Sequence, residues 1–171
     1  GFEVDGVEIS ASMIDRFYEQ TARLPQKVKD RMNIYRADIF EYDTTQQYDL
    51  IMIPSTTICL LADDEQKTKA LFEKVYRWLK PGGRFMFDYR VDQTLQGEFI
   101  SPIYTESNKE YPYVMFMQEF NNIVPGRGIV NMYVETFEEG CEKKYIASSN
   151  KRIITDALVD SFLCGIGFHL Y

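Results

Sequence analysis

Along the first 90 residues, hydrophobic positions follow a strand period and then a helix period, in alternation. Residues Glu3 to Ile9 alternate and carry β-branched side chains, which predicts a strand with Glu8 near its end. A helix is predicted next, with Ser10 and Ser12 as candidate N-caps. Its apolar side consists of Met13, Ile14, Phe17, Tyr18, Thr21 and Leu24.

Two further strands are predicted before residue 60. The first covers Asn33 to Ala37, and the second contains the unbroken apolar run from Leu50 to Pro54. A continuous apolar run of this length is typical of a parallel strand buried on both faces.

A helix and another strand complete this half of the chain. Asp63 and Gln66 form a candidate capping box at the helix start. The apolar stripe of the helix contains Leu71, Phe72, Val75, Trp78 and Leu79. Pro81-Gly82-Gly83 ends the helix and supplies the φ > 0 positions of a tight turn, and residues 84–89 form the next strand. This βαβα order predicts a largely parallel sheet with helices on both faces.

Beyond residue 97 the pattern changes to four strand-like runs without intervening helices. These runs are residues 99–107, 113–122, 128–139 and 143–154. Residues 125–128 (PGRG) and Glu139-Gly140 are the expected hairpin turns between the last three runs. The block therefore predicts an antiparallel sheet, inserted into or appended to the α/β body.

The chain returns to a helix at its end. Thr155 is the candidate cap, Gly165 and Gly167 end the helix, and residues 168–171 resemble the start of a strand. The side chains expected to face inward are Ala157, Leu158, Phe162 and Leu163.

Composition narrows the function classes. The chain has 171 residues and a net charge of -7, which disfavours a nucleic-acid partner because phosphate neutralisation requires clustered Lys and Arg. Cys59, Cys141 and Cys164 are scattered and odd in number, so neither a disulfide framework nor a metal site is indicated, and a reducing cytoplasm fits. No apolar run is long enough for a membrane span. Because the first residue is Gly1 rather than Met, we expect a trimmed or fragmentary start.

Four segments together resemble the class I S-adenosylmethionine-dependent methyltransferases, which have a Rossmann-like fold. The segments are VDGVEIS with Met13, ADIFEYD, YDLIMIPSTT and LKPGGRFMFDY. Their order and spacing carry the resemblance, above all the LKPGGR turn after the helix that follows YDLI. The resemblance extends over roughly residues 1–90 and 153–171.

The resemblance implies an S-adenosylmethionine site at the strand ends. Glu8 would accept hydrogen bonds from both ribose hydroxyls, because the two oxygens of a carboxylate match a vicinal diol. Ile9 or Met13 would pack against the adenine. Asp38 would accept from its exocyclic amine, while the backbone N–H of Ile39 would meet a ring nitrogen. The alternatives are a solvated acid at position 8, ordinary helix core at position 13 and a turn-forming acid at position 38.

Residues after the next two strands would complete the site at the carboxyl edge of the sheet. Pro54 and Ser55 are expected beside the cofactor, and Thr56 and Thr57 beside the methyl acceptor, although these hydroxyls would equally suit a helix cap.

The residues that follow the LKPGGR strand are the best-placed groups for chemistry on the acceptor. Asp88 and Tyr89 are the candidate catalytic residues. Arg90 is a candidate for holding a carboxylate or phosphate of the substrate, the alternative being a surface ion pair. His169 is a weak candidate for a base.

Two features depart from the family pattern. IPST lacks the Asn/Asp-Pro-Pro-aromatic sequence of methyltransferases that act on planar amide or nucleobase nitrogens, which favours a small-molecule acceptor. The glycine-rich loop that cradles the methionine end of the cofactor is also absent, with the strand before it. We therefore expect a longer polypeptide, with acid-x-Gly-x-Gly-x-Gly before Gly1 and a C-terminal tail; without that strand, two sheet edges would be unpaired.

We expect three parts in the chain. Residues 1–97 are a partial cofactor-binding core, residues 98–152 are the antiparallel block, and residues 153–171 return to the core. The block resembles insertions that cover the acceptor pocket or pair subunits, so a homodimer is one possibility. Its candidate pocket aromatics, otherwise sheet core, are Tyr104, Tyr111, Tyr113, Phe116, Phe120, Tyr133 and Tyr145.

The leading hypothesis is methyl transfer to a nitrogen, oxygen or carbon nucleophile of a small molecule, for which positioning matters more than a strong base. Two alternatives remain: a nicotinamide-dependent oxidoreductase, in which Glu8 would also hold a ribose, and a non-catalytic binding or assembly module.

Overall fold

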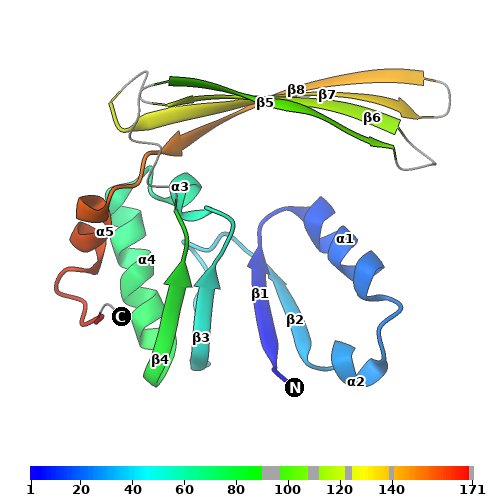
Figure 1. Ribbon diagram of the computed structural model, residues 1–171. Helices are drawn as coiled ribbons and strands as arrows, with labels where there is room; N and C mark the ends of the chain where they lie inside the picture. The colour runs from blue at the N-terminus through cyan, green and yellow to red at the C-terminus, as the bar shows by residue number, and fades with distance from the viewer. Residues whose placement is uncertain (90–96, 108–111, 122–124, 139–140, 170–171) are drawn as a thin grey trace. The chain divides into compact units, whose positions relative to one another are not determined.

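The computed structural model describes residues 1–89, 97–107, 112–121, 125–138 and 141–169 (Figure 1). The chain divides into two compact units, Gly1–Gln47 and Tyr48–Tyr171, which we call unit 1 and unit 2. Each unit is described by itself below.

Unit 1 consists of two parallel strands and two helices. Strand β1 (Val4–Glu8) leads into α1 (Ala11–Thr21), and α2 (Gln26–Lys29) leads into β2 (Met32–Arg36). The strands pair from Val4 opposite Met32 to Glu8 opposite Arg36. A parallel pair joined by a helical crossover is the βαβ arrangement that the alternating periods predicted.

Helix α1 begins at Ser10, whose hydroxyl accepts a hydrogen bond from the backbone N–H of Met13. Ser10 is therefore the N-cap, and the prediction for Ser12 is wrong; Ser12 bonds the Ser10 hydroxyl instead. The helix ends at Thr21, so Leu24 lies beyond it, contrary to the predicted apolar stripe.

Unit 2 contains a second parallel pair and its helices. Strand β3 (Tyr48–Ile53) is followed by α3 (Ile58–Leu61), α4 (Glu65–Trp78) and β4 (Leu79–Phe87). The register shifts between Tyr48 and Leu50, so that Tyr48 lies opposite Leu79 and Leu50 opposite Arg84. Gly82 within this irregular stretch has φ 77°, as predicted for the Pro-Gly-Gly turn, but Gly83 does not have a positive φ. The helix before it ends at Trp78, so the prediction that Pro81-Gly82-Gly83 ends the helix is wrong.

The β3–β4 pair is covered on one face. Ile53 is buried, and Phe72 of α4 contacts Phe85 and Phe87 of β4 on that face. On the other face Leu50 and Met52 are 45% and 54% exposed, so the prediction that this strand is buried on both faces is wrong for the described residues. Side chains alternate along a strand, and the helices α4 and α5 that supply this core cover one of its two faces.

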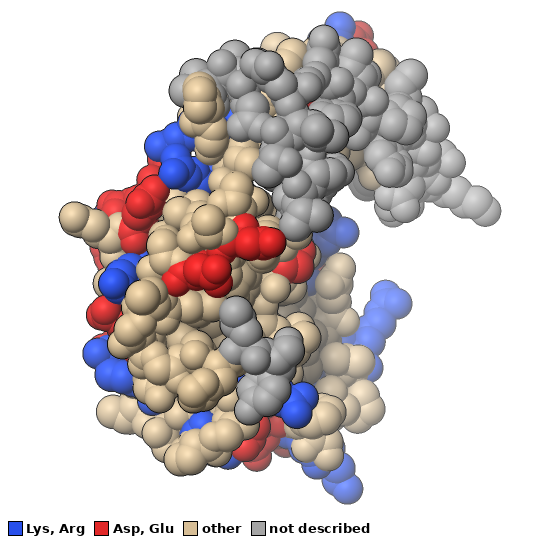
Figure 2. Space-filling model, turned by 60° about the vertical axis from the view of Figure 1, so that its left-hand side comes forward, with Lys and Arg blue, Asp and Glu red and all other residues tan. Residues whose placement is uncertain are grey.

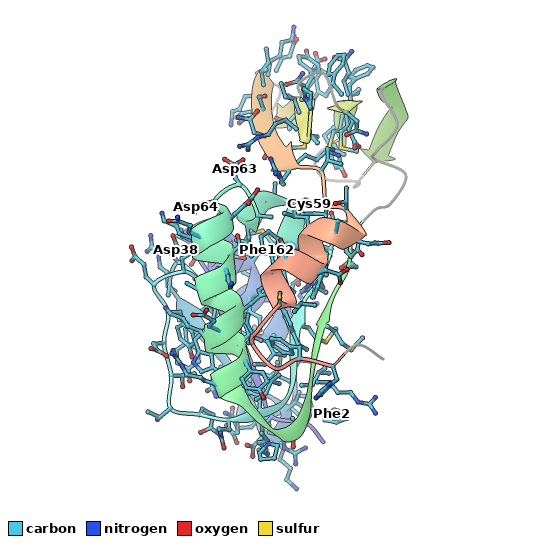
Figure 3. All side chains as sticks on the ribbon, turned by 90° about the vertical axis from the view of Figure 1, so that its left-hand side faces the viewer. Phe2, Asp38, Cys59, Asp63, Asp64 and Phe162 are labelled. Carbon is cyan, nitrogen blue, oxygen red and sulfur yellow. The ribbon has the colours of Figure 1, made fainter. Side chains whose placement is uncertain are left out.

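Helix α4 starts one residue later than the capping box predicted. Asp64 is the N-cap, and its carboxylate accepts from the backbone N–H of Lys67. Asp63 instead forms an ion pair with Arg127 (Figure 3). The apolar stripe of the helix is confirmed for Leu71, Phe72, Val75 and Trp78, which are buried. The prediction is wrong for Leu79, which lies beyond the helix and begins β4.

Helix α5 (Asp156–Leu163) is capped by Thr155, whose hydroxyl accepts from the backbone N–H of Leu158. Val159 and Phe162 are the buried side chains, and Phe162 packs against Phe72 of α4 (Figure 3). Ala157 is exposed, so its predicted inward orientation is wrong.

The chain after α5 follows the sequence prediction in part. Gly165 and Gly167 have φ of 77° and 112°, as expected at a helix end. Phe168 and His169 are not in a strand, contrary to the prediction, and residues 170–171 lie outside the described ranges.

A four-stranded antiparallel sheet completes unit 2, as predicted. Its strands, in spatial order, are β5 (Gly97–Ser107), β6 (Pro112–Asn121), β7 (Arg127–Glu138) and β8 (Cys141–Arg152). The sheet contacts the α/β part through α3 and β8, and the pair between Arg152 Nη2 and Glu65 Oε1 (2.8 Å) adds a second tie. Pro125-Gly126 forms the predicted turn before β7, whereas the predicted turn at residues 139–140 lies outside the described ranges.

One end of this sheet buries polar side chains. Lys151 of β8 forms an ion pair with Glu119 of β6, and both side chains are almost fully buried. The amide of Asn121 is buried beside them, opposite Gly128, where a Cβ would lie 2.7 Å from Lys151 Cε. Buried charges of this kind are tolerated because each compensates the other.

Among the helices in the described ranges, none has both the length and the apolar character that a membrane crossing requires.

Candidate active site

The first candidate group lies at the carboxyl edge of β1 and β2 in unit 1. Glu8 is the last residue of β1, and its carbonyl accepts from the backbone N–H of Ala37 (3.2 Å), directly before Asp38. Parallel strands end at the same edge, so Glu8 and Asp38 leave neighbouring strands side by side. We call Glu8, Ile9, Met13, Asp38 and Ile39 the unit 1 rim.

Each carboxylate of the unit 1 rim is held by local backbone. Glu8 Oε1 accepts from the N–H of Ser10 at 2.7 Å, and Asp38 Oδ1 accepts from the N–H of Phe40 at 2.9 Å. Asp38 therefore forms a turn, which the sequence analysis gave as the alternative to contact with adenine. A carboxylate has two oxygens and about four acceptor positions, so one short bond leaves capacity for a ligand.

Apolar side chains are exposed beside these acids. Ile9 is 64% exposed and Met13 is 54% exposed, whereas Ile39 is half-buried. The alternative assignment of Met13 to helix core is thus not what the structure of unit 1 shows. An exposed apolar surface next to hydrogen-bond acceptors suits one flat face of a purine and its polar edge.

The second candidate group, which we call the unit 2 rim, lies at the carboxyl edge of β3 and β4. It consists of Pro54, Ser55, Thr56 and Thr57 after β3, and of Asp88 and Tyr89 after β4. The carbonyl of Pro54 accepts from the N–H of Thr57 (3.3 Å) and from its hydroxyl (2.7 Å). This closes a four-residue turn directly before α3.

Asp88 reaches across to that turn. Its Oδ2 accepts from the backbone N–H of Thr56 at 2.9 Å, which joins the ends of β3 and β4. A catalytic role for Asp88 stays a prediction; the contact that the structure shows is with the backbone.

Tyr89, the residue after Asp88, contacts α5 and β4 instead of the turn. Its hydroxyl donates to Asp156 Oδ1 at 2.6 Å, and its ring stacks on Phe87. This hydrogen bond, together with partial burial and the charge of Asp156, raises the pKa of Tyr89 to about 12. The phenol is therefore protonated at neutral pH, and this geometry suits orienting a substrate better than accepting a proton.

The other predicted residues are placed as follows. Arg90 and Tyr111 lie outside the described ranges, as does the side chain of Tyr104. His169 is exposed. Among the aromatics of the sheet, the register places Phe116 and Tyr133 on one face, in ring contact, and Tyr113 and Tyr145 on the other.

Two features of the candidate site were missed by sequence reasoning. Asp156, the partner of Tyr89, follows the cap Thr155 and reads in the sequence as an ordinary acid of a first helical turn. The left-handed backbone at Ser55 and Thr56 has no sequence signal, because serine and threonine rarely adopt it.

The charged groups on the surface do not favour a polyanionic partner. Figure 2 shows acidic and basic side chains interspersed over the described part of the visible face, with the acidic ones gathered near its middle. The described part of this face therefore shows no continuous basic surface of the kind that contact with a phosphate backbone requires.

Comparison with known proteins identifies the fold. A family model described as "Methyltransferase domain" matches residues 1–85. A search of curated protein sequences found no match.

Several solved structures share the fold. The sugar N-methyltransferase KedS8 from a Streptoalloteichus species superposes with a TM-score of 0.76 at 14% identity, over 95% of this chain and 62% of that one. An S-adenosylmethionine-dependent methyltransferase from Clostridium acetobutylicum gives a TM-score of 0.68 at 18% identity, over 93% and 61%. DesVI from Streptomyces venezuelae gives 0.77 at 10% identity, over 95% and 65%.

The resemblance to class I methyltransferases is thus confirmed at the level of the fold, including the antiparallel sheet. The chain spans about 62% of the length of the KedS8 structure.

Proposed function

We propose that this protein transfers a methyl group from S-adenosylmethionine to a small-molecule nucleophile. The observation that carries the proposal is that Glu8 and Asp38 lie at the carboxyl ends of the neighbouring strands β1 and β2, beside exposed apolar side chains, in a region that matches a methyltransferase domain. When bound, S-adenosylmethionine would supply a methyl group already activated by a sulfonium.

The residues of the unit 1 rim fit the adenosine part of that cofactor. Glu8 would hold the ribose hydroxyls and Asp38 the adenine amine, with the N–H of Ile39 on a ring nitrogen. Ile9 and Met13 would lie against the adenine. Charge-assisted hydrogen bonds to a diol and an amine give both orientation and affinity.

The unit 2 rim would supply groups to both ligands. Pro54 and Ser55 are assigned to the cofactor, and Thr56, Thr57 and Arg90 to the acceptor. Tyr89 would orient the acceptor through its hydroxyl rather than remove its proton. A base is unnecessary for a neutral amine, which is already nucleophilic, so positioning supplies most of the rate.

An amine acceptor is favoured within the small-molecule class. The related structures include a sugar N-methyltransferase, an amino pentose methyltransferase and a glycopeptide N-methyltransferase, the last also solved with S-adenosylhomocysteine and with S-adenosylmethionine. We extend this chemistry to the present protein as a proposal. Residues 98–152 would cover the acceptor, and a cytoplasmic location and a homodimer stay predictions.

Calorimetric titration with S-adenosylhomocysteine tests the cofactor assignment. Glu8→Ala is expected to weaken binding by about 1.5–3 kcal/mol, the scale of a charge-assisted hydrogen bond. Glu3→Ala is the matched control, because Glu3 is an exposed acid just before β1. Equal affinity in Glu8→Ala and Glu3→Ala would remove Glu8 from the site.

Two further results would contradict the proposal. Tighter binding of NAD than of S-adenosylhomocysteine would favour the oxidoreductase. Absence of heat with either ligand would favour a non-catalytic module.

A further inference from the structure

The turn after β3 contains two adjacent residues in an unfavourable backbone conformation. Ser55 has φ 61° and Thr56 has φ 55°, and no other non-glycine residue in the described ranges has a positive φ. Left-handed backbone is costly for a β-branched residue because its Cβ approaches the carbonyl oxygen. Such a conformation persists only where neighbouring interactions hold it.

Interactions inside the turn hold one side of it. The N–H and the hydroxyl of Thr57 both donate to the carbonyl of Pro54, as in a hydrogen-bonded β-turn. The carbonyl of Thr56 accepts from the N–H of Cys59 at 2.9 Å, and Cys59 is buried in α3. These bonds fix where the turn begins and ends, but none of them uses the N–H of Thr56.

Asp88 holds the other side. The register places Ile53 opposite Phe87, so the residues that follow, Pro54 and Asp88, leave the two strands together. From there Asp88 Oδ2 accepts from the Thr56 N–H at 2.9 Å. A charged acceptor makes this bond stronger than a neutral one would.

We propose that Asp88 is a positioning residue that holds the Ser55–Thr56 turn in its left-handed form and thereby presents the exposed Ser55 at the unit 2 rim. The effect on methyl transfer rests on the proposed function. The effect on the turn does not. This role differs from direct contact with the reacting atoms, because Asp88 acts through the bond between its Oδ2 and the Thr56 N–H.

Asp88→Asn separates the two roles. The amide oxygen of asparagine still accepts from the Thr56 N–H, but asparagine has no basic oxygen. A positioning residue predicts kcat within about fivefold of wild type in Asp88→Asn, and a loss of tenfold or more in Asp88→Ala. A general base contributes typically 10²–10⁴-fold, so a loss of a hundredfold in Asp88→Asn would overturn the proposal.

A second substitution tests the strain directly. Glycine adopts positive φ without steric cost, so Thr56→Gly is expected to restore at least half of the lost kcat in the Asp88→Ala background. Thr57 has φ −54°, so glycine there relieves no such strain and Thr57→Gly is the matched control, expected to give no rescue. Equal behaviour of the two glycine variants would contradict the proposal.

Nuclear magnetic resonance gives a readout that does not depend on activity. In Asp88→Ala, amide exchange at Thr56 is expected to quicken by about tenfold or more, and the backbone chemical shifts of Ser55 and Thr56 should move away from left-handed values. In Asp88→Asn both should stay near wild type. Unchanged exchange and shifts in Asp88→Ala would overturn the positioning role even in an active enzyme, whereas an inactive wild-type chain with the expected exchange would refute the proposed function alone.

Discussion

At the scale of single residues, the hydroxyl of Tyr89 shows how one neighbour sets the chemistry of a side chain. The hydroxyl donates a 2.6 Å hydrogen bond to Asp156 Oδ1, and that bond is the largest contribution to raising the pKa of Tyr89 to about 12. Because the protonated phenol is the form that bonds Asp156, the bond stabilises the folded chain only while Tyr89 keeps its proton.

This gives a pH-dependent prediction. An unfolded tyrosine titrates near pH 10, so the stability from this bond is fully present below about pH 10 and is lost as the pH rises through 12. Tyr89→Phe is expected to lower the free energy of unfolding by about 1 kcal/mol at pH 7, since the bond is exposed. The difference from wild type should shrink above pH 10.

Urea unfolding followed by the fluorescence of Trp78 measures this. Trp78 is the single tryptophan and is buried in α4, so it reports on unit 2. Tyr145→Phe is the control, because Tyr145 is 51% exposed on β8. A Tyr89→Phe difference that grows above pH 10 would contradict the assigned bond.

The sequence predicted some residues of the candidate site and not others, for a physical reason. Glu8 is predictable because a strand that ends in an acid before a helix needs only a local pattern, whereas Asp38 was predicted from the resemblance of ADIFEYD to the methyltransferase family. The Thr56–Asp88 and Tyr89–Asp156 bonds join residues 32 and 67 positions apart, and no local pattern encodes them.

At the scale of elements, caps decide where helices begin. Asp63 and Asp64 are adjacent acids, and the capping-box pattern predicted the first. The structure uses the second, because Asp64 bonds the N–H of Lys67 while Asp63 pairs with Arg127 of the sheet. A tertiary contact of this kind cannot be read from the spacing of polar residues.

Replacing the two acids is therefore expected to lower the free energy of unfolding by different amounts. Asp64→Ala should lower the free energy of unfolding by about 1 kcal/mol, the usual cost of losing an N-cap. Asp63→Ala should cost about 0.5 kcal/mol or less, because an exposed ion pair contributes little.

Trp78 fluorescence in urea measures both variants, since α4 carries the probe. Asp64→Asn is the matched control and should stay near wild type, because asparagine also caps well. A larger loss in Asp63→Ala than in Asp64→Ala would contradict the observed cap.

Other elements show which helices and strands hydrophobic periodicity can predict. The strands and the long helices were predicted because their apolar positions repeat several times. Helices α2 and α3 have four residues each, too few for a period, and they were missed. The burial of β3 was overestimated because an apolar run does not show how many faces a sheet has covered.

At the scale of the whole molecule, burial is uneven. Within residues 1–47, all of which the structure describes, no residue is fully buried. Unit 2 has a dense core in which Phe72, Ile58 and Leu71 have almost no exposed surface. Two ion pairs tie the sheet to the start of α4 and the residues just before it: Arg127 with Asp63, and Arg152 with Glu65. Both pairs are partly exposed. We therefore expect the stability of unit 2 to come from apolar packing rather than from these ties.

Substitution of Phe72 tests most directly whether apolar packing stabilises unit 2. Its ring contacts Phe85 and Phe87 of β4 and Phe162 of α5, with centroids 5.1 to 5.7 Å apart, so it joins three elements. Phe72→Ala removes those contacts and leaves a cavity, and should lower the free energy of unfolding by about 3–5 kcal/mol. Phe72→Leu should lose less than half as much, because leucine fills most of the space.

Arg127→Ala and Arg152→Ala provide the comparison, since the first removes the pair with Asp63 before α4 and the second removes the pair with Glu65 of α4. Each should cost about 1 kcal/mol or less, because solvent screens a partly exposed pair. All four variants can be measured by urea unfolding with Trp78 as the probe. If either arginine variant cost as much as Phe72→Ala, the ion pairs rather than the aromatic core would hold unit 2 together. The ion pairs would then be what makes the antiparallel sheet and the parallel strands unfold together. The complete burial of Phe72 argues against this, because it places the main stabilising contacts in the apolar core.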